Sequence, residues 1–135
     1  CIPAALALAL GRVANFINAE LVGTVTNVSW CVNFPDYEGC RHPSQIYGAI
    51  KRFIIFGILV LLSRKERKPG FLFFSFIAMF GLGRLLLDYY REEAVRILSL
   101  SLGQWYSLTM FLVAGFVLIR YYRAEIKSVF YVTNQ

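Results

Sequence analysis

Apolar stretches separated by short polar connections make up most of this chain. Four such stretches are visible, at residues 1–10, about 43–63, 70–87 and 97–119. The last has no charged residue, with Gly103 and Gln104 marking an alternative start, and the third carries only Arg84. A helix needs about 20 residues to cross the hydrocarbon core of a bilayer. The pattern therefore predicts an all-α, polytopic transmembrane helical protein with about three full spans and part of a fourth.

The polar segment between the first two stretches has a different character. Residues 24–40 contain strand-forming and turn-forming residues, including Pro35-Asp36 and Glu38-Gly39, which predict an irregular loop. No repeat or linker divides the chain, so residues 1–135 form a single expected membrane-embedded domain. Because it opens with Cys1 inside an apolar run too short to span, we interpret it as a fragment whose N-terminal helices are missing. No basic segment precedes that run, which argues against a cleavable signal peptide.

Composition supports lipid as the solvent and excludes several partners. Hydrophobic residues make up 58% of the chain, above the 45–50% that is usual in soluble domains. The net charge is +6, but the basic residues flank apolar stretches and are not interleaved with stacking aromatics, so anionic lipid is a better partner than nucleic acid. One histidine and three cysteines without a CxxC pair predict no metal site, and we expect no cofactor.

Two of the cysteines, Cys31 and Cys40, share the polar loop. They can form a disulfide if the loop faces an oxidising compartment, or they can remain two unpaired thiols.

The distribution of lysine and arginine predicts the orientation. The connection 63–70 carries four of these residues, which places it in the cytoplasm by the positive-inside rule. Counting spans then places Arg120, Arg123 and Lys127, and with them the C-terminus, on the same side. Residues 11–42 and 88–96 fall outside the membrane.

The outer half nevertheless holds as many cations as the inner side. They are Arg12, Arg41, Lys51, Arg52, Arg84, Arg91 and Arg96. Several fall at bilayer depth, where a charge costs a few kcal/mol or more and persists mainly where it pairs or handles a ligand. Orientation does not require these charges, so they indicate an anionic ligand on the outer side.

Arg84 shows this most clearly. It follows Gly70 by 14 positions, or roughly 21 Å along a helix in a core about 30 Å thick. Asp88 and Arg91 follow at i+4 and i+7 and therefore share its face. We expect this stripe to line a basic cleft with one internal counter-charge.

Three polar clusters converge on the outer half. They are residues 11–23, with Arg12, Asn15, Asn18 and Glu20; residues 41–47, with His42, Gln45 and Tyr47; and the stripe of Arg84, Asp88 and Arg91. Guanidinium groups bind phosphate in a bidentate manner, and amides can orient glycerol hydroxyls. The set suits a phosphodiester head group. A serine hydrolase is disfavoured because GxSxG is absent and Ser44 is too close in sequence to His42 to imply a triad.

Four motifs resemble those of the prolipoprotein diacylglyceryl transferase family. GRVANFINAELVG resembles the family signature, RHPSQIYG its HPSQ-Y motif, FGLGRLLLDYYR its Arg-x-x-x-acid-x-x-Arg helix, and SLGQWYSLTMFLVAG its final helix. They occur in the family's order and cover nearly the whole chain.

The resemblance implies an activity and a location. Such enzymes move a diacylglyceryl group from phosphatidylglycerol to the lipobox cysteine thiol of a prolipoprotein signal peptide, and glycerol phosphate is released. They lie in the bacterial cytoplasmic (inner) membrane, with a cavity that opens outward.

The resemblance also implies site residues. Arg12, Asn15, Asn18 and Glu20 would bind the lipid head group, and Arg84 and Asp88 would belong to the catalytic pocket. Our hypothesis assigns Arg84 and Arg12 to the phosphate, with Asp88 and Glu20 holding their guanidiniums. Gln45, Tyr47 and Arg91 are further expected substrate-binding residues. His42 has either a catalytic role or a structural or head-group role.

Some positions depart from the family pattern. Asp88 stands where glutamate is expected, Thr24 where the signature often continues with arginine, and Gly48 where glutamate usually follows the tyrosine. The family's histidine-glycine motif, which belongs to an earlier helix, is missing.

Two alternatives to the enzyme stay open. One is a non-catalytic membrane transporter or lipid-binding protein, and the other is a truncated, inactive homologue. Against a transporter, the charges gather toward one side and no repeat is evident.

Overall fold

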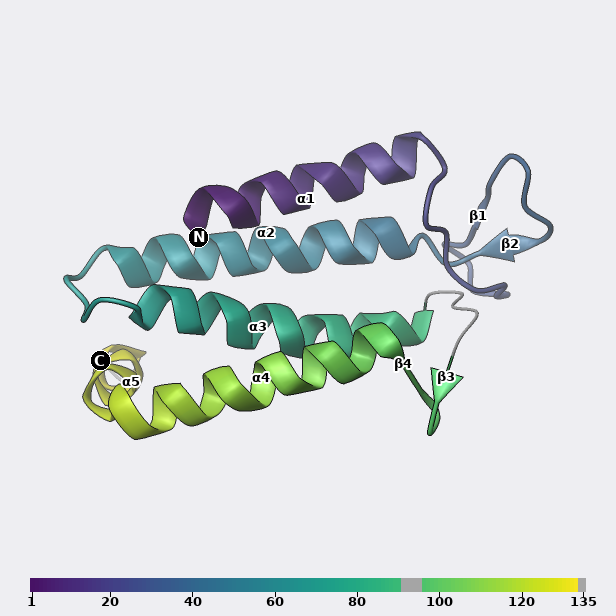
Figure 1. Ribbon diagram of the computed structural model, residues 1–135. Coiled ribbons are helices and arrows are strands. Elements are labelled where there is room, and N and C mark those ends of the chain that lie inside the picture. The colour runs from purple at the N-terminus through teal and green to yellow at the C-terminus, as the bar shows by residue number, and fades with distance from the viewer. Residues whose placement is uncertain (91–95, 134–135) are drawn as a thin grey trace.

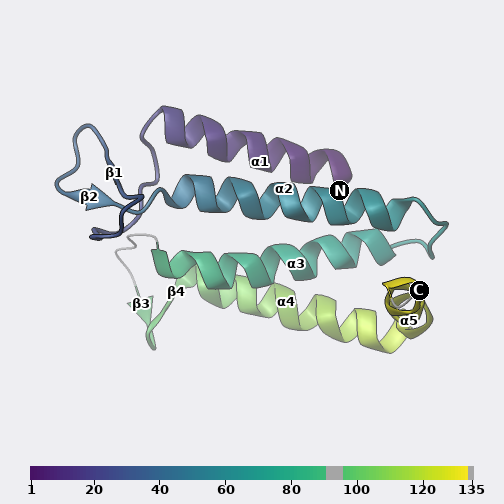
Figure 2. The same ribbon diagram turned by 180° about the vertical axis from the view of Figure 1, so that it is seen from behind.

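Four helices lie side by side in a single row. The computed structural model describes residues 1–90 and 96–133, and the row consists of α1 (Ile2–Ile17), α2 (Ser44–Ser63), α3 (Phe71–Leu87) and α4 (Leu102–Tyr121). Each helix packs on the next in chain order (Figure 1). The same order is seen from behind (Figure 2). Successive helices run in opposite directions, so their connections gather at the two ends of the row.

The two ends carry different structures. One end holds two antiparallel hairpins and a short 3₁₀ turn: β1 (Val32–Asn33) with β2 (Cys40–Arg41), η1 (Asp88–Tyr90), and β3 (Arg96–Ile97) with β4 (Leu100–Ser101). The other end holds the α2–α3 connection and α5 (Arg123–Thr133), which lies crosswise to the row (Figure 1). The helical architecture is confirmed. The irregular loop expected at residues 24–40 contains the short β1–β2 hairpin, and a second hairpin, β3–β4, precedes α4.

Helix α4 begins later than residue 97. A capping box sets its start, because the Ser101 hydroxyl accepts the Gln104 N–H at 3.1 Å and the Gln104 side chain accepts the Ser101 N–H at 2.9 Å. Such a box satisfies two backbone donors that a helix start leaves open. Residues 97–101 are apolar enough to be taken for helix, but they belong to the β3–β4 hairpin.

Helix α1 extends beyond the apolar run at residues 1–10. It continues to Ile17, so Arg12 and Asn15 lie on a helix rather than in a loop. Helix α5 was not expected from the sequence. It begins at Arg123, directly after Tyr122, which caps the C-terminal end of α4.

Close packing between α3 and α4 depends on small residues. A Cβ at Gly81 would lie 2.8 Å from the Ser107 carbonyl oxygen, so only glycine permits this approach. Ser107 and Ala114 are buried on the facing side of α4. The glycine therefore serves close packing of the two helices.

Much of the apolar surface faces outward. On α4, Leu112, Val113, Phe116 and Ile119 are 56–66% exposed, and a contiguous apolar face of this kind is unusual on a soluble monomer. Helices α2 and α4 are long and apolar enough to cross a membrane, with mean hydropathies of 1.9 and 1.6, whereas α1 and α3 are shorter apolar helices. These features fit a membrane protein. The number of complete spans stays a prediction.

Candidate functional site

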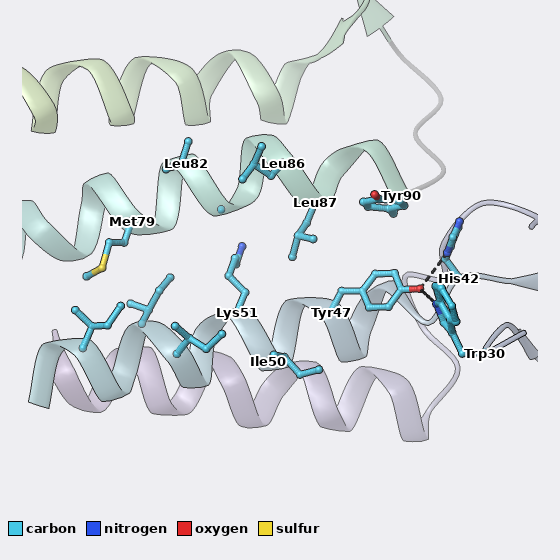
Figure 3. Close-up of a pocket in the computed structure, with 14 residues that line it drawn as sticks. Trp30, His42, Tyr47, Ile50, Lys51, Met79, Leu82, Leu86, Leu87 and Tyr90 are labelled. Atoms are coloured by element: carbon cyan, nitrogen blue, oxygen red, sulfur yellow. Dashed lines mark hydrogen bonds between the residues drawn. The ribbon is translucent and has the colours of Figure 1, made fainter. Parts of the chain in front are cut away.

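A groove of about 660 Å³ runs between α2 and α3. Aliphatic side chains form its walls: Ile50, Ile54 and Ile58 from α2, and Met79, Leu82 and Leu86 from α3. Lys51 projects from α2 into the space between the helices (Figure 3). Tyr47, His42, Trp30 and Tyr90 close the end nearest the hairpins. The groove is thus an apolar trough with one ammonium group along its length and an aromatic, polar end.

Hydrogen bonds organise that polar end. The Tyr47 hydroxyl accepts the indole N–H of Trp30 at 2.6 Å and is hydrogen-bonded to Nδ1 of His42 at 3.0 Å (Figure 3). The ring of Tyr90 packs edge-on against His42 and Tyr47, with centroid distances of 5.1 and 5.7 Å. The sequence predicted site roles for His42 and Tyr47. It did not point to Trp30 or Tyr90, which reach the site from a distant loop and from η1.

Backbone pairing brings His42 to this position. The N–H of Gly23 donates to the His42 carbonyl at 3.2 Å, and the His42 N–H donates to the Thr24 carbonyl at 3.1 Å. A Cβ at Gly23 would lie 2.5 Å from the His42 oxygen, so the close pairing requires glycine. The loop after α1 therefore holds the histidine as a neighbouring strand would.

A disulfide closes the same loop. Cys31 and Cys40 are joined, with their Cα atoms 5.4 Å apart, a usual separation for a disulfide. Of the two alternatives left open by the sequence, the structure supports the bridge. The bridge lies between Trp30 and Arg41, so it constrains the part of the loop that supplies Trp30.

Lys51 packs against a glycine and an aromatic ring on α3. A Cβ at Gly83 would overlap the aliphatic carbons of the lysine, and the ammonium lies 5.4 Å from the centre of the Phe80 ring. The guanidinium carbon of Arg52 lies 5.3 Å from the same ring. A cation over an aromatic face is stabilised by the ring quadrupole. Lys51 and Arg52 had no individual role in the sequence interpretation, although their position inside an apolar stretch was the signal for one.

Arg12 and Arg52 meet beside a second glycine. A Cβ at Gly48 would lie 3.0 Å from Nη1 of Arg52 and 3.5 Å from Cδ of Arg12. Arg52 is buried, and its Nη1 donates to the Gly48 carbonyl at 3.4 Å. Glycine at this position, where the family resemblance leads one to expect glutamate, leaves room for two arginine side chains between α1 and α2.

Arg84 and Asp88 meet beside a third glycine. Nε of Arg84 lies 3.5 Å from Oδ2 of the buried Asp88, which confirms that the two residues share a face. A Cβ at Gly103 of α4 would lie 2.8 Å from Nη2 of Arg84 and 3.3 Å from the same Asp88 oxygen. Arg91, the third member of the expected stripe, lies outside the described residues.

Lys51 lies among these charged residues. Its ammonium is within electrostatic range of Arg52, Arg12, Asp88 and Arg84. Arg12 faces α2 and Arg84 faces α4, so the two arginines lie at different helix interfaces, with Lys51 interacting with both. The result is an array of cations across three helices, near the hairpin end of the row, with Asp88 as a counter-charge.

The remaining predicted residues build the turn after α1. Gln45 is fully buried and donates from Nε2 to the Glu20 carbonyl at 2.7 Å, and the Glu20 N–H donates to the Asn15 carbonyl at 2.8 Å. Asn18 caps the C-terminal end of α1 and lines a separate hollow with residues 32–37. The side chains of Asn18 and Glu20 are exposed. Their head-group role stays a prediction, because the structure places them at this turn and not along the groove.

Comparison with known proteins places these motifs in a family. The family model described as prolipoprotein diacylglyceryl transferase matches residues 1–120. A relative from Geobacter sulfurreducens named phosphatidylglycerol–prolipoprotein diacylglyceryl transferase is 45% identical over 119 residues, which cover 83% of this chain and 46% of the relative. A relative of the same name from Brucella anthropi is 41% identical over 118 residues, or 83% of this chain and 41% of the relative. The chain thus spans less than half the length of these relatives. No solved structure matches it.

Proposed function

Because the chain belongs to the prolipoprotein diacylglyceryl transferase family, we propose that it contributes the lipid site of an enzyme that transfers a diacylglyceryl group from phosphatidylglycerol to the lipobox cysteine of a prolipoprotein signal peptide. The observation that carries this proposal is the apolar groove that leads past Lys51 to a polar end, beside an array of buried and half-buried arginines. No cofactor takes part in the proposed reaction.

Three successive parts of the groove each fit a different part of a phospholipid. Ile54, Ile58 and Leu82 line an apolar trough. An acyl chain bound there covers apolar side chains that are otherwise exposed. The phosphodiester lies near Lys51 and the arginine array, because charge-assisted hydrogen bonds are strongest where water is excluded. The glycerol head group extends toward His42 and Tyr47. Asn15, Asn18, Glu20, Gln45 and Arg91 remain proposed substrate-binding residues, with Gln45 acting by fixing the Glu20 turn.

The reaction places a specific demand on the cations. A C–S bond forms between the cysteine thiolate and the glyceryl carbon while the C–O bond to the phosphate breaks, and the negative charge passes from sulfur to the departing phosphate. Guanidinium groups already in place stabilise that charge without reorganisation. Arg84, held by Asp88, and Arg12 are the residues we assign to this task. The thiol proton leaves before or during the attack, because only the thiolate is a good nucleophile.

His42 is placed at the head-group end of the groove. The indole N–H of Trp30 donates to the Tyr47 oxygen, and the Tyr47 hydroxyl is also hydrogen-bonded to Nδ1 of His42. The Tyr47 oxygen has two lone pairs, so either Nδ1 or the hydroxyl group can supply the proton of the second bond. Both the catalytic role and the head-group role of His42 therefore stay within the proposal.

The proposed location follows from the family and the charge distribution. The protein lies in the bacterial inner membrane, with the hairpin end and the groove's polar end facing outward. The α2–α3 connection and the C-terminus are cytoplasmic, because they carry lysine and arginine at helix ends.

A transfer assay on the full-length protein tests this function. Reconstituted protein is given phosphatidylglycerol and a lipobox peptide, and formation of the thioether-linked lipid is followed. We expect Arg84→Gln and Arg12→Gln each to lower turnover by 10²-fold or more, as is typical when a donor to a developing oxyanion is removed.

The matched control is Arg64→Gln at the opposite, cytoplasmic end, which should retain wild-type turnover. Wild-type turnover in both site variants contradicts the residue assignment. Binding of phosphatidylglycerol without any transfer by the unaltered protein contradicts the enzymatic function and supports a lipid-binding role.

A further inference from the structure

Helix α5 lies beyond the family match, which ends at residue 120. Figures 1 and 2 both show α5 end-on while the other helices run across the view. Its axis is therefore roughly perpendicular to the row. If the long apolar helices cross a membrane, a perpendicular helix at their cytoplasmic end lies parallel to the membrane plane.

Specific contacts hold α5 in this direction. Nη1 of Arg67, in the α2–α3 connection, forms an ion pair with Oε2 of Glu125 at 3.1 Å and donates to the Ser128 hydroxyl at 2.6 Å. The Arg67 and Glu125 side chains are only 8% and 17% exposed. Just before the helix, the Tyr122 hydroxyl donates to the Pro69 carbonyl at 2.7 Å. These contacts link α5 to a connection more than fifty residues earlier, so it is a positioned element and not a continuation of α4.

The sequence of α5 is amphipathic. Ile126, Val129 and Phe130 follow the spacing that places residues on one helical face. Ile126 and Val129 are half-buried, whereas Phe130, at the edge of this face, is 67% exposed. Arg123 and Lys127 are also exposed, and their spacing places them beside that face. An apolar face with flanking basic residues is typical of helices that lie in a membrane interface.

The surrounding charge favours an anionic partner. This end of the molecule carries Arg64, Lys65, Arg67, Lys68, Arg120, Arg123 and Lys127 against Glu66 and Glu125. Glu125 is already engaged by Arg67. The excess of cations is concentrated where the cytoplasmic leaflet would meet the helices, and anionic lipid attracts basic residues at such a surface.

We propose that α5 is an interfacial helix that binds anionic phospholipid of the cytoplasmic leaflet. Arg123 and Lys127 contact the lipid phosphates, and Phe130 inserts among the acyl chains near the head groups. The Arg67–Glu125 pair sets the rotation of the helix, which leaves Phe130, Arg123 and Lys127 exposed to the lipid. This surface lies at the opposite end of the row from the groove and does not depend on the transfer reaction.

Fluorescence quenching in nanodiscs tests the proposal on the full-length protein. An environment-sensitive fluorophore is attached at Phe130→Cys or at Ala124→Cys, in a background with Cys1→Ser. The nanodiscs contain nitroxide lipids, either phosphatidylglycerol or phosphatidylcholine. We expect strong quenching at residue 130 and weak quenching at residue 124, which lies on a different side of the helix, one turn before Ser128.

Lipid charge supplies the second arm of the experiment. Quenching at residue 130 should be stronger with nitroxide phosphatidylglycerol than with nitroxide phosphatidylcholine. The variants Arg123→Gln and Lys127→Gln should each reduce this preference about fivefold, the effect of roughly one basic residue at an anionic surface. If these variants do not fold, the dependence of quenching on lipid charge is measured in protein that retains Arg123 and Lys127, by varying the phosphatidylglycerol content of the nanodiscs.

Three results would overturn the proposal. One is equal access of a water-soluble quencher to residues 124 and 130. Another is equal quenching at residue 130 by nitroxide phosphatidylglycerol and nitroxide phosphatidylcholine. The third is protection of residue 130 that rises with protein concentration, which would instead show that a second copy covers the helix. None of these readings requires transfer activity, so they are independent of the proposed function.

Discussion

Single glycines make room for the cations of the candidate site. Gly48 faces Arg12 and Arg52, Gly83 faces Lys51, and Gly103 faces Arg84. In each case the glycine allows a long charged side chain to lie between packed helices. Each cation depends on the space beside its glycine, so replacement of either residue should disturb the arrangement of cations.

Replacement of Lys51 tests the groove directly. Lys51→Met keeps the length and apolar stem of the side chain but removes its charge. We expect KM for phosphatidylglycerol to rise about tenfold or more, because a hydrogen bond to a charged group is worth about 1.5–3 kcal/mol. Lys51→Arg should recover part of this loss. Steady-state transfer kinetics measure the effect, and an unchanged KM in Lys51→Met would exclude the lysine from lipid binding.

A substitution at Gly103 tests the position of Arg84. The side chain of Gly103→Val would meet the Arg84 guanidinium and the Asp88 carboxylate, whose atoms lie 2.8 and 3.3 Å from the first added carbon. We expect turnover to fall by about 10²-fold, since misplacement by 1 Å can cost that much. Gly115→Val is the matched control on the same helix, because no atom lies within 4 Å of its Cβ position. Equal turnover in the two variants would argue against the prediction.

At the scale of elements, the connections rather than the helices shape the polar end of the groove. The segment between α1 and α2 supplies Trp30 and His42, and η1 supplies Tyr90. The Cys31–Cys40 bridge and the backbone pairing of Gly23 with His42 hold this segment in place. Loops on a rigid scaffold are where binding residues concentrate.

Removal of the disulfide should loosen the polar end selectively. The bridge spans 9 positions, and closing a loop of that size is worth about 2–3 kcal/mol. We expect Cys31→Ser/Cys40→Ser to lower the temperature at which Trp30 fluorescence changes, measured in a Trp105→Phe background, and to reduce transfer. Cys1→Ser, at an exposed free thiol, should have no effect. A Trp30 transition that does not move would show that the bridge is dispensable.

For the molecule as a whole, the two ends of the row of helices carry different structures. Hairpins, the disulfide and the polar end of the groove lie together, and the basic α2–α3 connection and α5 lie opposite (Figure 1). This asymmetry matches the expected orientation, because disulfides persist outside the cytoplasm and basic loops remain inside.

Cysteine labelling tests the orientation. Leu98→Cys lies in the exposed turn of the β3–β4 hairpin, and Lys127→Cys lies on α5. An impermeant maleimide added to spheroplasts, with Cys1→Ser as background, should label residue 98 fully and residue 127 only after permeabilisation. The reverse pattern would invert the proposed topology.

The sequence by itself determined the helical, strongly apolar character of the chain, the Arg84–Asp88 pairing and the family, because each depends on local spacing or on contiguous motifs. It missed α5, and it did not locate the start of α4 securely, because a short apolar hairpin resembles the beginning of a span.

Only the tertiary structure decided which distant groups meet. Trp30 and Tyr90 joining His42 and Tyr47, Lys51 in the groove, and Gly103 beside Arg84 are contacts between residues from different elements. The tertiary structure also places Asn18 and Glu20 at the turn after α1, where their head-group role stays a prediction. A linear pattern records the type and spacing of residues, but the helix packing and loop paths that bring side chains together are set by the whole fold.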